Sequence, residues 1–164
     1  RLNYLPYLMG ERTPHLNPNC RGVFFGLSAI HTKADMLRAV MEGVSYSLLD
    51  CFDILREMKV NVKEMMACGG GGKSRVWRQM LADMYGCEVK TIKAQEGPAL
   101  GVAILAGVGA GIFPDVQTAC KEFIEQDTWC QPDAAAHAYY EKGHALYQKL
   151  YQKLKDCYED LAAL

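Results

Sequence analysis

A row of four glycines is the segment of this sequence best suited to chemistry. It follows the short apolar run from Met65 to Cys68, which is typical of a strand. Glycines expose backbone N–H groups, and such a nest before a helix suits a phosphate or a ribose edge. A tight turn of flexible glycines is the plainer alternative, but the length of the row and the Lys-Ser that follows favour a nucleotide. The row is Cys68-Gly69-Gly70-Gly71-Gly72-Lys73-Ser74.

Two familiar glycine motifs do not fit. A P-loop has the pattern G-x-x-x-x-G-K-[ST], but five positions before Gly72 stands Ala67, inside the predicted strand. No apolar strand ending in aspartate follows to hold magnesium. The segment 107–111, Gly-Val-Gly-Ala-Gly, resembles a dinucleotide fingerprint faintly, yet it falls in a predicted helix rather than after a strand.

The composition is that of an ordinary globular domain. Half of the 164 residues are apolar, 23% are charged, and the net charge is −1. This balance gives no support for a nucleic acid or membrane partner. No apolar run approaches the roughly 18 residues that span a bilayer, so we expect a cytoplasmic protein. Seven cysteines without a C-x-x-C pair predict free thiols, and four scattered histidines predict no metal site.

The elements that must hold the glycine row can be placed from local signals. Residues 1 to 30 contain many turn formers and are predicted to be an ordered loop region. Thr32, with Asp35 three residues later, predicts the capped start of a long helix that fades near residues 59–61. Its inward stripe is predicted to be Leu37, Val40, Met41, Val44, Leu48, Phe52 and Leu55.

Beyond the glycines, helices and strands alternate. Ser74 is predicted to cap a helix that ends at Gly86, followed by a strand over 87–92. Further helices are predicted from Pro98 to about Gly111, over 115–123, and from about Asp133 to the end. The inward face of the helix after Ser74 is predicted to be Trp77, Met80, Leu81 and Met84. That of the last helix is predicted to be Leu146, Leu150, Leu154, Tyr158 and Leu161. This order indicates an α/β domain with an incomplete sheet and flanking helices.

Several motifs resemble the FGGY carbohydrate kinases, and among them the xylulokinases. They run from about Leu8 to Gly111 in the order expected for the second domain of that family. The segment 22–27, a spacer of seven residues and the segment 35–42 fit the family signature at every position. The other matching segments are Gly10-Glu11-Arg12-Thr13-Pro14-His15, Gly69 to Asp83 with its Trp77-Arg78-Gln79-Met80-Leu81-Ala82-Asp83, and Gly97-Pro98-Ala99-Leu100-Gly101-Val102-Ala103.

The resemblance implies an actin-like, ribonuclease-H-like ATPase domain, the carboxy-terminal lobe of a two-lobe kinase with ATP between its lobes. It implies that 1–164 divides into a loop-rich cleft region (1–30), a βα core (31–112) and carboxy-terminal helices (113–164). The start at Arg1, without a methionine, is also expected of an excised domain. Arg12 and Thr13 could line the cleft rim, although Arg12 could equally form a surface ion pair with Glu11. The adenosine part of ATP is implied to lie against Gly69, Gly70, Gly71, Gly72 and Ser74.

The same resemblance implies what this chain does not hold. In the family, the catalytic aspartate and both phosphate loops lie upstream of the matched segment, so most of the Mg²⁺ site is also expected outside it. The implied function is transfer of the ATP γ-phosphoryl group to a pentulose, with xylulose as the first candidate, by a longer enzyme. The chain alone is expected to be inactive. A non-enzymatic actin-like nucleotide-binding module and, less favoured, a dinucleotide-dependent oxidoreductase domain are the alternatives. The sugar and a homo-oligomeric state stay open.

Overall fold

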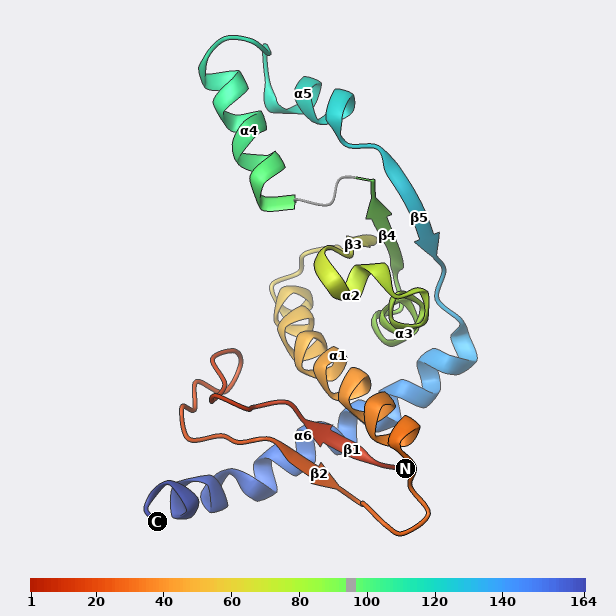
Figure 1. The fold of residues 1–164 in the computed structure, drawn as a ribbon, viewed down its shortest axis with the longest axis vertical. Coiled ribbons are helices and arrows are strands. Elements are labelled where there is room, and N and C mark those ends of the chain that lie inside the picture. The colour runs from red at the N-terminus through yellow and green to blue at the C-terminus, as the bar shows by residue number, and fades with distance from the viewer. Residues whose placement is uncertain (94–96) are drawn as a thin grey trace. The chain divides into compact units, whose positions relative to one another are not determined.

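The structure is a computed structural model that describes residues 1–93 and 97–164 (Figure 1). Within these ranges the chain forms five strands and six helices. They divide into two compact units. Unit 1 comprises Arg1–Val62, Asp83–Gly86 and Pro132–Leu164, and unit 2 comprises Lys63–Ala82 and Cys87–Gln131. Each unit is described by itself.

Unit 1 combines a small hairpin with two long helices. Strands β1 (Asn3–Leu5) and β2 (Val23–Phe25) pair antiparallel, so the predicted loop region contains a sheet. Helix α1 (Lys33–Glu57) approaches β1 so closely that a Cβ on Gly43 would collide with the backbone of Tyr4. Helix α6 (Ala134–Ala162) contacts both β1 and α1 and closes the core of this unit.

The cap predicted at Thr32 for the first long helix is confirmed. The Thr32 side chain accepts a hydrogen bond from the Asp35 backbone, and the Asp35 carboxylate accepts one from the Thr32 N–H at 2.7 Å. These bonds to Thr32 lower the pKa of Asp35, because they stabilise its charged form. Asp133 caps α6 in the same way, accepting from the Ala136 N–H at 2.7 Å.

The predicted inward faces of these two helices are partly wrong. On α1, Phe52 is buried as predicted, but Leu37, Leu48 and Leu55 are 56%, 52% and 41% exposed. The buried face also holds Tyr46 and Leu49 together with polar side chains. On α6, Leu150 and Tyr158 are buried as predicted, but Leu161 is exposed. The residues that α6 buries are mostly aromatic or small: Tyr140, Gly143, His144, Tyr147, Leu150, Tyr151 and Tyr158.

Unit 2 is built on a three-stranded sheet in the order β3-β4-β5. Strand β3 (Glu64–Met66) pairs parallel with β4 (Glu88–Ile92), whose residues alternate between buried and half-buried as predicted. Strand β5 (Gln126–Cys130) pairs antiparallel with β4. The prediction of helices alone after residue 113 was therefore wrong, since β5 interrupts them and forms one edge of the sheet.

The helices of unit 2 follow the predicted order. The glycine row forms the short helix α2 (Gly69–Lys73), and α3 (Arg75–Tyr85) follows it, with its last residues in unit 1. Met80 and Met84 of α3 are buried as predicted. Helices α4 (Gly97–Gly109) and α5 (Val116–Phe123) pack on each other, and Asp115 caps α5. The residues that the structure describes include no helix long and apolar enough to cross a membrane.

Candidate functional site

The glycine row forms a single helical turn, the short helix α2, between β3 and α3. Cys68 ends the extended segment after β3, and Gly69 begins α2 with a φ of +72°. A side chain is strained in this left-handed region, so glycine is required at Gly69. The turn ends at Ser74, whose N–H donates to the Gly71 carbonyl at 3.2 Å.

The second half of this turn is held tightly by its neighbours. A Cβ on Gly72 would lie 2.7 Å from the Ala67 carbonyl oxygen, so only glycine lets the turn meet the end of β3 this closely. A Cβ on Gly71 would lie 3.1 Å from the ring of Trp77. Trp77, half-buried, is therefore a packing residue of the turn. Trp77 lies six positions after Gly71 in the sequence, and the join between α2 and α3 at Ser74 brings its ring back onto the turn.

The first half of the turn is open. Apart from the turn's own backbone and the adjacent residues, no atom of the described chain lies within 4 Å of a Cβ built on Gly69 or Gly70. A bound molecule can therefore approach this backbone directly. The row thus divides into a clamped half, Gly71 and Gly72, and an open half, Gly69 and Gly70.

Ser74 joins the turn to helix α3, as the sequence predicts. Its hydroxyl accepts a hydrogen bond from the Trp77 N–H at 3.3 Å, and its carbonyl accepts one from the Arg78 N–H at 2.9 Å. This is the role of a helix cap. A capping role accounts for the serine without any ligand, so a contact between Ser74 and adenosine stays a prediction.

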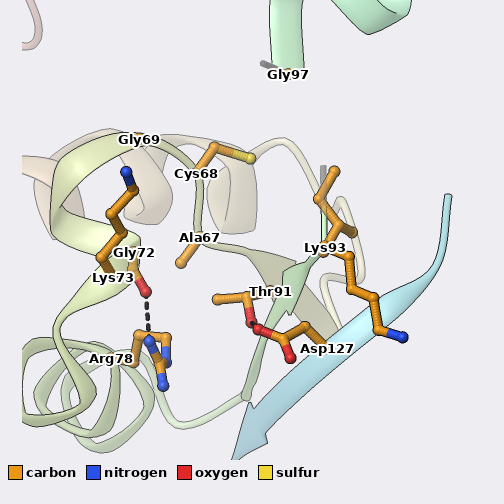
Figure 2. Close-up of a pocket in the computed structure, with 11 residues that line it drawn as sticks. Ala67, Cys68, Gly69, Gly72, Lys73, Arg78, Thr91, Lys93, Gly97 and Asp127 are labelled. Carbon is orange, nitrogen blue, oxygen red and sulfur yellow. Dashed lines mark hydrogen bonds between the residues drawn. The ribbon is translucent and has the colours of Figure 1, made fainter. Parts of the chain in front are cut away.

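The turn forms one wall of a cleft of about 450 Å³ in unit 2 (Figure 2). The opposite wall comes from β4 and β5, where the buried Thr91 hydroxyl lies 2.7 Å from that of Thr128 and 3.5 Å from the Asp127 carboxylate. The cleft is lined by Ala67, Cys68, Gly69, Gly72, Lys73, Arg78, Thr91, Ile92, Lys93, Gly97 and Asp127.

Among the described residues that line this cleft, cations outnumber anions. Lys73, Arg78 and Lys93 line it together with the carboxylate of Asp127, and Lys93 also forms an ion pair with Glu125. Surplus positive charge beside exposed N–H groups suits an anionic group such as a phosphate. Asp127 was missed at the sequence level because β5 was not predicted. Arg78 was seen only as part of a motif.

Arg12 and Thr13, the predicted cleft-rim residues, are exposed and belong to unit 1. The two carboxylate oxygens of Glu11 accept from the backbone N–H groups of Thr13 and His15, at 2.8 and 2.9 Å. Glu11 therefore shapes the loop. Within the two described ranges, Arg12 has no ion pair, with Glu11 or any other residue. Its place at a rim stays a prediction.

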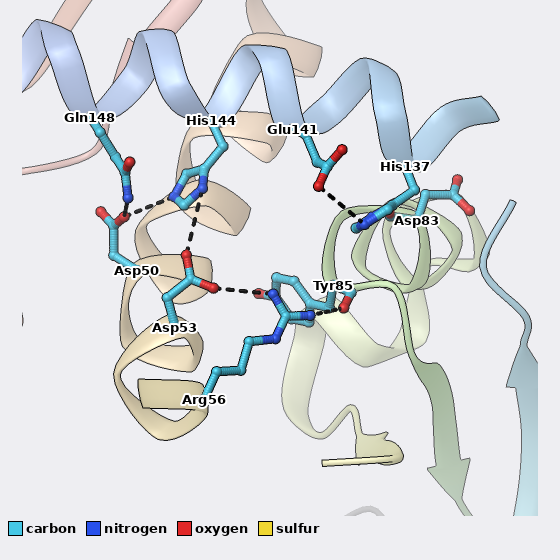
Figure 3. A network of polar contacts seen from close by, with 9 residues as sticks. All are labelled: Asp50, Asp53, Arg56, Asp83, Tyr85, His137, Glu141, His144 and Gln148. Carbon is cyan, nitrogen blue, oxygen red and sulfur yellow. Dashed lines mark hydrogen bonds and ion pairs between the residues drawn. The ribbon is translucent and has the colours of Figure 1, made fainter. Parts of the chain in front are cut away.

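Unit 1 contains a polar network that the sequence did not predict (Figure 3). The buried Asp50 carboxylate lies 2.8 Å from His144 Nε2 and accepts from Gln148 at the same distance. Arg56 pairs with Asp53 at 3.1 Å and donates to the Tyr85 carbonyl at 2.6 Å. These contacts tie α1 to α6 and to the end of α3, so the network acts in the packing of unit 1.

Glu42 and Asp83, both part of the quoted motifs, also have structural partners. Glu42 is buried and accepts from Arg38 at 2.9 Å, one helical turn away. The Asp83 carboxylate accepts from the Asp133 N–H at 2.9 Å, at the start of α6. Buried carboxylates need such partners. The described residues contain no group of three His, Cys, Asp or Glu placed to hold a metal ion, and all seven cysteines are free thiols.

The sequence is similar to proteins of a known family. Residues 1–110 match the family model described as "FGGY family of carbohydrate kinases, C-terminal domain". The xylulose kinase of Staphylococcus epidermidis is 40% identical over 99% of this chain and 33% of its own length. The gluconokinase of Bacillus subtilis is 44% identical over 67% of this chain and 22% of its own length.

Solved structures agree. The ligand-bound xylulose kinase from Lactobacillus acidophilus superposes with a TM-score of 0.89 at 32% identity, over 98% of this chain and 32% of that one. Gluconate kinase from the same organism gives 0.88 at 32% identity, over the same shares. These neighbours have the actin-like ATPase fold that the sequence resemblance implies.

The oxidoreductase alternative has no support. Helix α4 ends at Gly109, so its glycines lie in and just after a helix and not behind a strand. The chain spans about a third of the length of the curated relatives that it matches. The motifs, the fold and the family match agree, and this chain belongs to the FGGY family of carbohydrate kinases, whose carboxy-terminal domain it matches.

Proposed function

We propose that this chain supplies the adenosine side of the ATP site in a longer sugar kinase. The observation that carries this proposal is the division of the glycine row. Its open half, Gly69 and Gly70, offers bare backbone at the edge of a cleft, and its clamped half fixes the direction of that backbone. Preorganised N–H groups bind a nucleotide without the entropic cost of ordering a loop.

The reaction proposed is transfer of the γ-phosphoryl group of ATP to a hydroxyl of a pentulose. Xylulose is the first candidate, because relatives named xylulose kinase match almost the whole chain. Gluconate is the second, because relatives named gluconokinase and gluconate kinase are as similar. The residues that choose between these sugars are proposed to lie largely in the other lobe.

The remaining parts of the machinery are proposed to come from outside this chain. Phosphoryl transfer needs a carboxylate near the attacking hydroxyl and groups that neutralise charge on the β- and γ-phosphates. The described residues do not fit a metal site. Mg²⁺ is therefore proposed to be held by the phosphates of ATP and by residues of the other lobe.

The test uses the complete kinase that contains this domain. ADP release is measured with D-xylulose, other pentuloses and gluconate, and ATP and ADP binding is measured by calorimetry with Mg²⁺. We expect sugar-dependent ADP release with one sugar preferred. ATP binding without turnover on any sugar would instead favour the non-enzymatic module. The isolated 164-residue chain is expected to release no ADP.

A further inference from the structure

Arg78 reaches back from the first turn of α3 to the glycine row (Figure 2). Its Nη1 donates a hydrogen bond to the carbonyl oxygen of Gly72. That carbonyl lies at the end of the short helix α2, where carbonyls have no partner within the helix. A bond from a guanidinium is charge-assisted and stronger than one from a neutral donor.

Placing the Arg78 guanidinium here costs desolvation free energy, and no neighbouring carboxylate among the described residues compensates its charge. Arg78 is half-buried, and its Nε is buried without a hydrogen-bond partner among the described residues. In the ranges 1–93 and 97–164 no carboxylate forms an ion pair with it. A cation with an unpaired buried donor destabilises a fold. A residue that served stability alone would be replaced at little loss by an apolar side chain of similar length.

The position of the bond indicates what it does instead. Gly71 is held by Trp77 and Gly72 by the end of β3, and the Arg78 bond fixes the carbonyl that closes the turn. These contacts act on the clamped half, while the open half carries the N–H groups that a ligand would meet. A turn of four glycines has the greatest conformational freedom of any sequence, so its direction depends on such contacts.

We propose that Arg78 is a positioning residue that holds the open half of the glycine turn in the direction required to bind ATP. This inference rests on the proposed function of the turn. Nη1 donates to the Gly72 carbonyl, so the proposed role of Arg78 is exerted through the backbone of the turn, and hydrogen exchange of that backbone reports it whether or not the guanidinium also faces a phosphate. Its loss is expected to weaken nucleotide binding while leaving the sugar site unchanged.

The test compares Arg78→Met, Arg78→Lys and Arg75→Met in the complete kinase. Arg75 is the matched control, because it is an exposed arginine on the same helix for which no contact is found among the described residues. In Arg78→Met we expect the KM for ATP to rise about tenfold, the worth of one charge-assisted hydrogen bond. The KM for sugar should stay within about twofold. Arg78→Lys should recover part of the loss, because lysine keeps the charge but not the planar geometry. Arg75→Met should match the wild type.

A second measurement separates positioning from general stability. Amide hydrogen exchange over residues 68–74 should speed up in both Arg78 variants, while the rest of α3 keeps its protection. If Arg78→Met does not fold, Arg78→Lys decides by the same two measurements. Wild-type KM for ATP and wild-type exchange in the folded variant would overturn the proposal. An equal rise in both KM values would also overturn it. Failure of the proposed function gives a different result, in which Gly70 variants also leave ATP binding unchanged.

Discussion

Replacing Gly70 by alanine is expected to raise stability and lower nucleotide affinity at once. Gly70 lies in helix α2, its φ is not positive, and no described atom outside the turn itself lies within 4 Å of a Cβ built on it. Alanine is favoured over glycine in a helix by about 0.5–1 kcal/mol, and a compatible site gains that amount mainly through the unfolded chain. The free energy of unfolding should therefore rise by up to about 1 kcal/mol.

The expected loss of ATP affinity follows from the open space beside Gly70. A methyl group on Gly70 takes the place of any ligand atom that contacts this backbone. A hydrogen bond between a backbone N–H and a phosphate oxygen contributes about 1.5–3 kcal/mol. If the methyl group prevents one such bond, affinity for ATP falls about 10- to 100-fold.

Two measurements on the complete kinase decide this prediction. Urea unfolding gives the change in stability, and calorimetric titration of ATP with the steady-state KM gives the change in affinity. Gly109→Ala is the matched control, because this glycine ends α4 with open space around it and lies outside the cleft. It should leave ATP binding unchanged. Wild-type affinity in a folded Gly70→Ala variant would refute the assignment of the open half to nucleotide.

Three further predictions concern stability. Gly72→Ala places a Cβ 2.7 Å from the Ala67 carbonyl oxygen, so urea unfolding should show a loss of about 1–3 kcal/mol. Asp50→Ala leaves the buried His144 without its 2.8 Å hydrogen-bond partner, which should cost about 1–3 kcal/mol in the same assay. Burial lowers the pKa of His15, so below about pH 6.5 the unfolded chain takes up a proton that the folded one resists. Stability should fall from pH 8 to pH 5.5 more steeply in the wild type than in His15→Phe, and equal slopes would contradict this cause.

Local signals explain why the order of elements could be predicted so well. Thr32, Ser74 and Asp133 each begin a helix by accepting a hydrogen bond from the backbone N–H three residues ahead. Such bonds depend on a few neighbouring residues, which the sequence displays directly. Gly86 likewise ends α3 with a φ of +64°. The position of the glycine row between strand and helix followed from the same kind of signal.

Contacts between distant segments could not be predicted in the same way. Strand β5 has the short run Thr128-Trp129-Cys130, which favours a strand, but flanking polar residues hide its alternation. Its pairing with β4 brings Asp127 into the cleft beside Thr91, although the two residues are 36 positions apart in the sequence. The Arg78 bond joins residues only six positions apart, but the sequence does not indicate which carbonyl oxygen accepts from an arginine on a helix. The lining of the cleft could therefore be identified only from the three-dimensional structure.

Helix α1 shows why an apolar stripe does not identify the buried face. A period of 3.6 residues marks a helix, and it correctly located α1. The side that packs on β1 and α6, however, carries Ser45 and Asp50 among its buried residues, and these are held by hydrogen bonds rather than by apolar contact. Leu37 and Leu48 are exposed, and the periodicity of apolar residues in the sequence does not distinguish them from buried ones. Which face a helix buries is decided by the partners that the rest of the chain supplies, and a hydrogen bond to such a partner allows a polar side chain to lie on the buried face.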